Sequence, residues 1–120
     1  MLAFAAGLAP AVWAQGDAAR GEALALNRSQ GLCVLCHALP GQNPALQGTI
    51  GPPLAGVGSR MDADGLRQRL VAPERFNPDT VMPSYGRTTG LQQVATAQRG
   101  QALLTDAQID DLVAWLGTLR

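Results

Sequence analysis

The residues best placed to do chemistry are two thiols and an imidazole in one short run, Cys33-Val34-Leu35-Cys36-His37. This is the C-x-x-C-H pattern of c-type haem attachment. Each thiol adds across a haem vinyl group and becomes a thioether, and the two-residue gap sets both sulfurs at the reach of the porphyrin edge. The histidine follows directly, so its imidazole can ligate the iron from the proximal side. The motif therefore predicts one covalent haem c, with His37 as a metal ligand.

Two other interpretations of the motif are less well supported. A structural zinc site is nearly always four-coordinate with Cys and His ligands, and the whole chain has two Cys and one His. A thioredoxin-like redox pair sits beside a βαβ pattern, and the sequence contains no convincing β-strand run. Haem attachment is therefore favoured over a redox dithiol and over zinc.

The ligand on the other side of the iron can be sought by elimination. The only histidine is already used, lysine is absent and both cysteines are consumed. With Met1 removed in export, the remaining candidates are Met61, Met82 and Tyr85. We expect Met82, because Pro83 directly after it stiffens the loop that must present the sulfur to the iron. Met61 can instead fill a gap in the core.

A His/Met axial pair would also indicate what the haem does. Such a pair raises the reduction potential relative to other axial sets, and it leaves no open position for a substrate. It therefore favours electron transfer over chemistry at the iron. A haem-based sensor or ligand binder, by contrast, would need a weak or absent distal ligand.

Composition limits the chain to one small domain. It has 120 residues and 4% aromatic residues, so we expect the haem to supply much of the core. Acidic and basic residues balance at 9 each, and all the basic residues are arginines. No basic tract indicates a nucleic-acid partner.

Residues 1–14 are uncharged and mostly apolar, which suits the core of a signal peptide and is too short for a membrane span. Val12-Trp13-Ala14 ends in a small residue and suits cleavage before Gln15. Because a basic n-region is missing, we expect the true signal peptide to start further upstream. The alternative is an ordered N-terminal helix. On the first interpretation residues 15–120 form the mature domain, which is exported to the periplasm and keeps no membrane anchor.

Three helices are predicted among long loops. Asp17 caps a helix that runs to about Arg28, and a second runs from Asp62 to about Val71, before Pro73. Residues 39–60 are so rich in Gly and Pro that we expect neither helix nor sheet there. Residues 73–86 should form a rigid loop, and residues 90–101 an irregular surface loop, which is a candidate for facing a partner.

The last helix has the clearest pattern. Thr105-Asp106-Ala107-Gln108 is a capping box. Apolar residues then recur at i, i+3, i+4 and i+7, namely Ile109, Leu112, Val113 and Leu116. Acidic residues in the early turns, among them Asp111, favour the helix dipole, and Trp115 is expected in the core.

The run Ile50-Gly51-Pro52-Pro53-Leu54 resembles the Gly-Pro-x-Leu motif of class I cytochromes c. The resemblance implies an all-α fold of three to four helices and long loops around one covalent haem, with Gly21 and Leu24 of the first helix against the last helix. It also implies that the Pro52 carbonyl accepts a hydrogen bond from His37 Nδ1 and that Leu54 packs on the porphyrin. Arg60 stands where that family places an arginine near a haem propionate, although it could equally be an ordinary surface charge.

The chain from about residue 17 onward is further similar to the SoxX family, the small mono-haem subunits of SoxAX cytochromes. The most specific shared run is Phe76-Asn77-Pro78-Asp79-Thr80-Val81-Met82-Pro83. This resemblance implies a SoxA-like haem subunit as partner. The complex would couple thiosulfate oxidatively to a cysteine of a SoxY-type carrier protein and pass the electrons to an acceptor cytochrome. A free-standing periplasmic electron shuttle remains the alternative.

Overall fold

The computed structural model describes residues 16–91 and 94–120, which form five α-helices and three short 3-10 helices with no strand. The predicted signal peptide at residues 1–14 lies outside the described residues. The α-helices are α1 (Ala18–Leu26), α2 (Cys33–Cys36), α3 (Val57–Arg60), α4 (Ala63–Val71) and α5 (Asp106–Thr118), and the 3-10 helices are η1 (Pro44–Leu46), η2 (Pro73–Arg75) and η3 (Thr96–Gln98). The predicted all-α architecture is confirmed.

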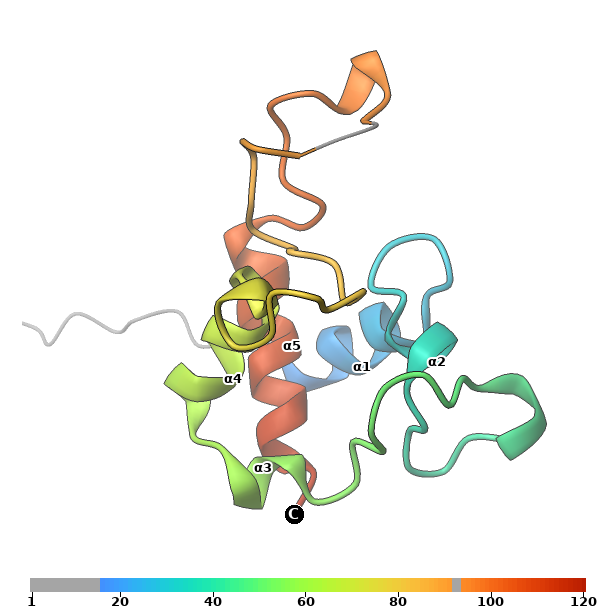
Figure 1. Cartoon of the computed structure of the whole chain (residues 1–120). Helices are drawn as coiled ribbons and strands as arrows, with labels where there is room; N and C mark the ends of the chain where they lie inside the picture. The colour runs from blue at the N-terminus through green and yellow to red at the C-terminus, as the bar shows by residue number, and fades with distance from the viewer. Residues whose placement is uncertain (1–15, 92–93) are drawn as a thin grey trace, which may run out of the picture.

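Helix α5 is the central element, and its start follows the predicted capping box. Thr105 Oγ1 accepts a hydrogen bond from Gln108 N–H at 3.2 Å, and Gln108 Oε1 accepts one from Thr105 N–H at 2.9 Å. The apolar stripe faces inward, so that Ile109 and Leu112 have no exposed surface and Trp115 is buried as expected. Figure 1 shows α1 and α4 on either side of this helix.

The crossing of α1 over α5 depends on a residue without a side chain. A Cβ atom at Gly21 would lie 2.0 Å from the Asp111 carbonyl oxygen and 2.9 Å from Trp115 Cβ. The two helix backbones therefore touch at this point, as the class I cytochrome resemblance implied.

The same crossing holds a buried carboxylate. Arg20 donates to Asp111 through Nε at 2.9 Å and Nη2 at 3.0 Å, and Asp17 N–H donates to Asp111 Oδ1 at 2.7 Å. These contacts with Arg20, and then the Asp17 amide, lower the pKa of the Asp111 carboxyl below its usual range. Asp111 therefore ties the first helix to the last, a tertiary role in addition to the helix-dipole role expected from its position.

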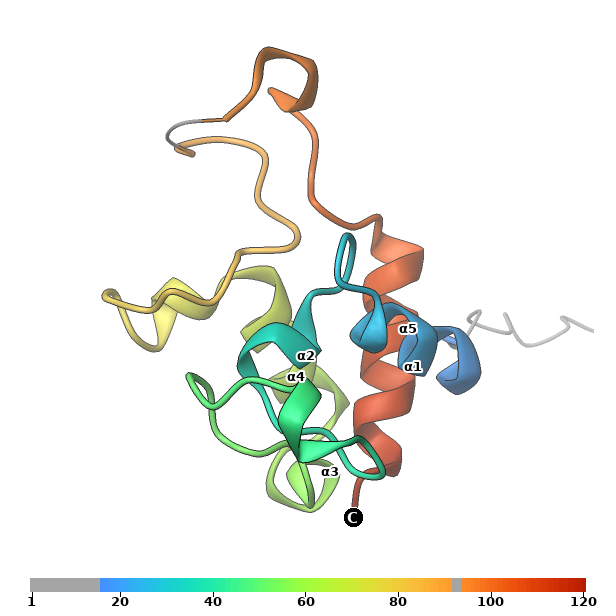
Figure 2. The same ribbon diagram turned by 90° about the vertical axis from the view of Figure 1, so that its right-hand side faces the viewer.

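Helix α4 begins and ends close to the predicted residues. Asp62 Oδ1 accepts a hydrogen bond from Gly65 N–H at 2.8 Å, and the helix ends two residues before Pro73. Leu66 and Leu70 are buried at i and i+4. Within residues 90–101, the described residues 90–91 and 94–101 are irregular apart from the short helix η3, and both ribbon views show them projecting from the helices (Figures 1 and 2).

The expectation that residues 39–60 contain no helix was wrong for the 3-10 helix Pro44–Leu46 and for the α-helix Val57–Arg60. Gly56 has φ = +76°, a left-handed conformation that turns the chain into this helix without the steric cost a side chain would bring. Gly58 N–H donates to the Leu119 carbonyl oxygen at 2.9 Å, and a Cβ at Gly58 would lie 2.5 Å from Gly117 O. Docking on the end of α5 thus stabilises a turn that local composition disfavours.

None of the helices in the described residues is both long enough and apolar enough to cross a membrane.

Candidate haem site

Helix α2 places the two thiols of the motif on one turn. Cys33 and Cys36 are three residues apart, so they lie on the same side of the helix. His37 ends the helix, with its N–H donating to the Cys33 carbonyl oxygen at 2.9 Å. The turn is entered through Leu32 with φ = 65°, a conformation that few residues other than glycine adopt. The chain therefore makes a sharp, locally strained entry into the attachment motif.

A second segment runs alongside the motif and holds it. Three backbone N–H groups of residues 48–54 donate to carbonyl oxygens of residues 34–38. The donors and the acceptors follow one another in the same order, so the two segments run in the same direction. The pairs are Gly48 to Val34 at 2.8 Å, Gly51 to Cys36 at 2.7 Å and Leu54 to Ala38 at 3.0 Å. The Gly-Pro-Pro-Leu run is thus fixed against the attachment helix.

The imidazole of His37 is oriented by this second segment. His37 Nδ1 lies 2.6 Å from the Pro52 carbonyl oxygen, which is the contact implied by the resemblance to class I cytochromes. A carbonyl oxygen can only accept, so Nδ1 must carry the proton and donate it. The lone pair of Nε2 is then free for a metal, and the hydrogen bond raises the basicity of the imidazole.

The other residues expected in this segment lie nearby. Leu54 is partly buried and packs against the core. Arg60 is exposed, and its guanidinium donates to the Ala55 carbonyl oxygen at 2.9 Å and to Pro53 O at 3.4 Å. Arg60 thus clamps the loop that follows Pro52. The sequence suggests a propionate partner or an ordinary surface charge for this arginine, and it gives no sign of these contacts with carbonyl oxygens of its own loop.

Met82 lies in the segment between η2 and η3. Its side chain is partly buried and packs against the core, and its N–H donates to Thr80 Oγ1 at 3.1 Å. Tyr85 is buried, and its hydroxyl donates to the Gly31 carbonyl oxygen beside the attachment helix. Burial raises the pKa of Tyr85 well above its ordinary value. The phenol is therefore neutral and occupied, which favours Met82 over Tyr85 as a ligand.

The base of the Met82 loop is closed by a carboxylate that sequence reasoning did not single out. Ser84 Oγ donates to Glu74 Oε2 at 2.5 Å, and Arg87 Nη1 lies 3.4 Å from Glu74 Oε1. The Ser84 hydroxyl, with a smaller contribution from Arg87, lowers the pKa of the Glu74 carboxyl. No local pattern could have linked Glu74 to a serine 10 residues later, because the pairing depends on the fold of the loop.

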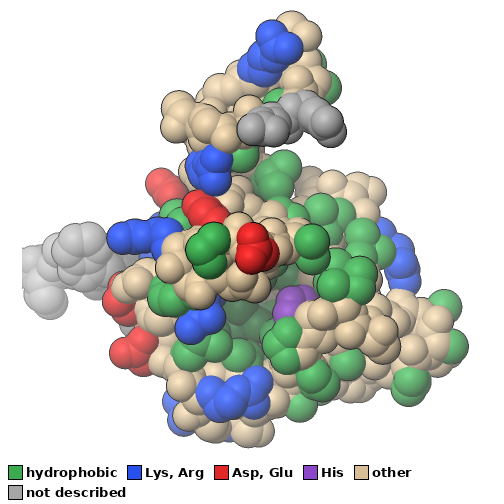
Figure 3. Space-filling view, in the orientation of Figure 1, with side chains coloured by type: hydrophobic (Ala, Val, Ile, Leu, Met, Phe, Trp, Pro, Cys, Tyr) green, Lys and Arg blue, Asp and Glu red, His purple; other side chains and the backbone are tan. Residues whose placement is uncertain are grey.

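The residues present fit a covalent haem. Figure 3 shows a hollow with hydrophobic side chains around it, and the chain's one imidazole lies at its side. In the same orientation, the loop after η2 lies along the upper edge of the hollow (Figure 1). Two thiols on one turn, an imidazole with Nε2 free and an apolar hollow form the donor set and surroundings that haem c requires. Met61, the other candidate ligand, is partly buried in the core next to α3.

The state of Cys33 argues against a redox dithiol. Burial raises the pKa of its thiol to about 11, whereas reactive cysteines have a lowered pKa because the thiolate is the nucleophile. The described residues also lack the strands of a βαβ unit. In the haem-free chain Cys33 is therefore a poor nucleophile.

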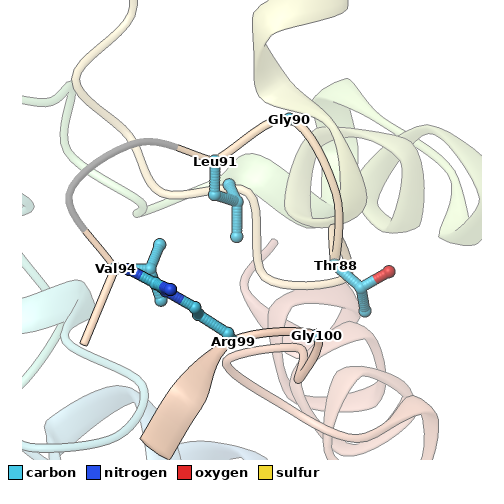
Figure 4. Close-up of a pocket in the computed structure, with 6 residues that line it drawn as sticks. All are labelled: Thr88, Gly90, Leu91, Val94, Arg99 and Gly100. Atoms are coloured by element: carbon cyan, nitrogen blue, oxygen red, sulfur yellow. The ribbon is translucent and has the colours of Figure 1, made fainter. Parts of the chain in front are cut away.

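A separate cavity of about 320 Å³ lies in the projecting segment. Its lining residues are Thr88, Gly90, Leu91, Val94, Arg99 and Gly100, and Figure 4 shows the side chains of Leu91, Val94 and Arg99 around it. None of the candidate haem residues lines this cavity. It is therefore distinct from the hollow beside His37.

Comparisons with known proteins agree with this geometry. The cytochrome c family model matches residues 18–120. A search of curated proteins finds no match. Among solved structures, a chain in the crystal structure of SoxXA from P. pantotrophus superposes with a TM-score of 0.77 and 30% sequence identity, covering 93% of this chain and 88% of that chain. The chain therefore belongs to the cytochrome c family, as a class I cytochrome c whose similarity to SoxXA supports the SoxX resemblance predicted from its sequence.

Proposed function

We propose that this chain is a mono-haem electron carrier in which Cys33 and Cys36 hold the haem and His37 and Met82 are its axial ligands. Membership of the cytochrome c family implies covalent haem c and an electron-transfer role. The observation that carries the residue assignment is the hydrogen bond from His37 Nδ1 to Pro52 O at 2.6 Å. It leaves Nε2 as the only atom of the ring that can bind iron.

When bound, the haem supplies an iron that takes up and releases one electron. The protein's part is to control that iron. The Pro52 carbonyl fixes the imidazole and raises its basicity, which stabilises the oxidised state. Met82 would occupy the distal side, and a thioether raises the potential relative to other axial ligands. If His37 and Met82 both hold the iron, the protein would leave no position on it open to a substrate.

The finer assignment is a SoxX-type subunit in the periplasm. In this role the chain pairs with a SoxA-like haem subunit and receives electrons from oxidative coupling of thiosulfate to a cysteine of a SoxY-type carrier protein. It then passes them to an acceptor cytochrome. Two observations support the proposal, the similarity to SoxXA at 30% identity and the signal-like composition of residues 1–14.

The ligand assignment is tested by absorption spectroscopy of the ferric holoprotein. Met82→Ala should abolish the weak Met-sulfur band near the red end of the spectrum. Met61→Ala is the matched control, because it removes another partly buried methionine and should leave the band in place. The opposite pattern would refute Met82 as the ligand.

The partner assignment is tested by purification from a native extract under low-salt conditions. A SoxX-type subunit should elute with a second haem protein in a stable heterodimer. Elution only as a monomer, without a companion haem protein, would contradict the assignment and favour a free-standing electron shuttle.

A further inference from the structure

Apart from the packing of the Met82 side chain against the core, the loop that carries Met82 makes few contacts with the rest of the protein. In the described part of the chain, the hydrogen bonds of residues 76–83 run only between neighbours and reach no further back than Pro73. The Arg69 guanidinium also stacks over the Phe76 ring at 3.9 Å from its centroid, near the start of the loop. Neither these hydrogen bonds nor the stacking on Phe76 fixes the backbone at the end of the loop where Met82 lies.

The bonds that fix that end lie just after Met82. Tyr85 N–H donates to the Leu70 carbonyl oxygen at 3.0 Å. Before it comes Ser84, whose hydroxyl binds the Glu74 carboxylate at 2.5 Å. Only Pro83 separates Ser84 from Met82, and its ring fixes the backbone angle φ. A movement of Ser84 is therefore transmitted directly to Met82.

We propose that Glu74 is a positioning residue for the distal ligand, because its carboxylate closes the loop and holds the Met82 side chain at the haem site. This inference rests on the proposed assignment of Met82. The two carboxylate oxygens serve different partners, Ser84 and Arg87. Hydrogen bonds to a charged acceptor are stronger than those between neutral groups. Arg87 is itself held by the carbonyl oxygens of Thr89 at 2.8 Å and Gly90 at 2.5 Å.

The proposal predicts how readily an external ligand displaces the methionine. The loop must open before imidazole can take the distal position, so weaker closure raises the apparent affinity for imidazole. The test titrates ferric holoprotein with imidazole and follows loss of the Met-sulfur band. Glu74→Gln removes the charge but keeps an acceptor, and Ser84→Ala removes the donor.

We expect each variant to bind imidazole about two- to tenfold more tightly than the wild type, the effect of one lost hydrogen bond. Asp79→Asn is the matched control, because it removes the same charge at an exposed residue of the loop that carries Met82. Its imidazole affinity should stay within about twofold of the wild type. Because both variants weaken the same contact between Ser84 and Glu74, the double variant should show little more effect than the larger single change.

An imidazole affinity of Glu74→Gln equal to that of Asp79→Asn would overturn the proposal. If Glu74→Gln does not fold, the conservative Ser84→Ala variant takes its place in this comparison. An imidazole affinity of Ser84→Ala equal to that of Asp79→Asn would then overturn the proposal. Failure of the underlying assignment is recognised separately. If the Met-sulfur band persists in Met82→Ala, Met82 is not the ligand, and the role of Glu74 falls with it. If the band is lost there and the Glu74 and Ser84 variants still bind imidazole like the wild type, only the positioning role is refuted.

Discussion

Gly51 is the residue whose substitution tests the orientation of the imidazole most directly. A Cβ at this position would lie 2.4 Å from His37 Cε1, 2.6 Å from Nδ1 and 2.8 Å from Nε2. Ordinary van der Waals contact begins at 3.4 Å, so Gly51→Ala must separate the ring from the backbone by 1.0 Å. Because Pro52 is the next residue, the same movement lengthens the hydrogen bond from Nδ1 to its carbonyl oxygen. A movement of that size along the hydrogen bond would lengthen it from 2.6 Å to about 3.6 Å, which is too long for a hydrogen bond.

Loss of this bond should raise the midpoint potential of the bound haem. The imidazole becomes less basic and donates less to the ferric iron, so the oxidised state is less stable. A hydrogen bond contributes about 0.5–1.5 kcal/mol. If all of that energy distinguishes the two redox states, the potential rises by about 20–65 mV, at 59 mV per tenfold change for one electron.

The measurement is a spectroelectrochemical titration of the holoprotein, with haem content checked first. Gly117→Ala is the matched control, because a Cβ at Gly117 meets nothing within 4 Å. Its potential should equal that of the wild type. A wild-type potential and spectrum in Gly51→Ala would show that the Pro52 carbonyl does not hold the ring.

Three further changes test the fold and the attachment. Leu112 has no exposed surface, so Leu112→Ala should lower the free energy of unfolding by about 2–5 kcal/mol in a denaturant titration; a loss well below that range would contradict its burial. Asp111→Asn should lower the thermal midpoint at neutral pH. Because Arg20 and the Asp17 amide depress the pKa of Asp111, the stabilisation is present above the ordinary value of 3.8 and is lost as the pH falls through the lower folded value. The difference between wild type and variant should therefore close below that pH, and a constant difference at all pH values would refute the ion pair. Cys33→Ala or Cys36→Ala should release haem more readily on denaturing extraction, and retention equal to the wild type would rule out a thioether at that position.

The elements that could be predicted from the sequence are those whose signals are local. The capping box at Thr105 and the stripe from Ile109 to Leu116 define α5 within one stretch of chain, and Asp62 and Pro73 bracket α4 in the same way. Helix α3 could not be predicted, because it depends on Gly58 meeting the end of α5, far away in sequence. Asp111 shows the same limit. Its position suited the helix dipole, but its partner Arg20 lies 91 residues earlier.

For the haem site, the attachment motif and the Pro52 contact followed from short motifs. The Met82 assignment followed from the small number of other possible ligands. The residues that support the site were not foreseen, because their partners are set by loop geometry. Arg60 binds carbonyl oxygens of its own loop, and Tyr85 donates to the Gly31 carbonyl oxygen. Glu74 closes the loop that carries Met82 by binding the Ser84 and Arg87 side chains. Neither the backbone acceptors nor these side-chain pairings can be identified from a local sequence pattern.

The tie between Asp17 and Asp111 has a consequence for variation in chain length. Their hydrogen bond joins residues 94 apart and closes almost the entire domain into one ring. The entropy cost of such a closure grows only with the logarithm of its length, and even doubling the ring would cost about 0.6 kcal/mol more. The projecting segment, within residues 90–101, lies inside this ring, and its described part projects away from the helices, including the attachment helix α2 (Figures 1 and 2). Insertions or deletions there should therefore be tolerated at little thermodynamic cost, and this segment is the part of the fold that can most easily change in length without affecting the haem.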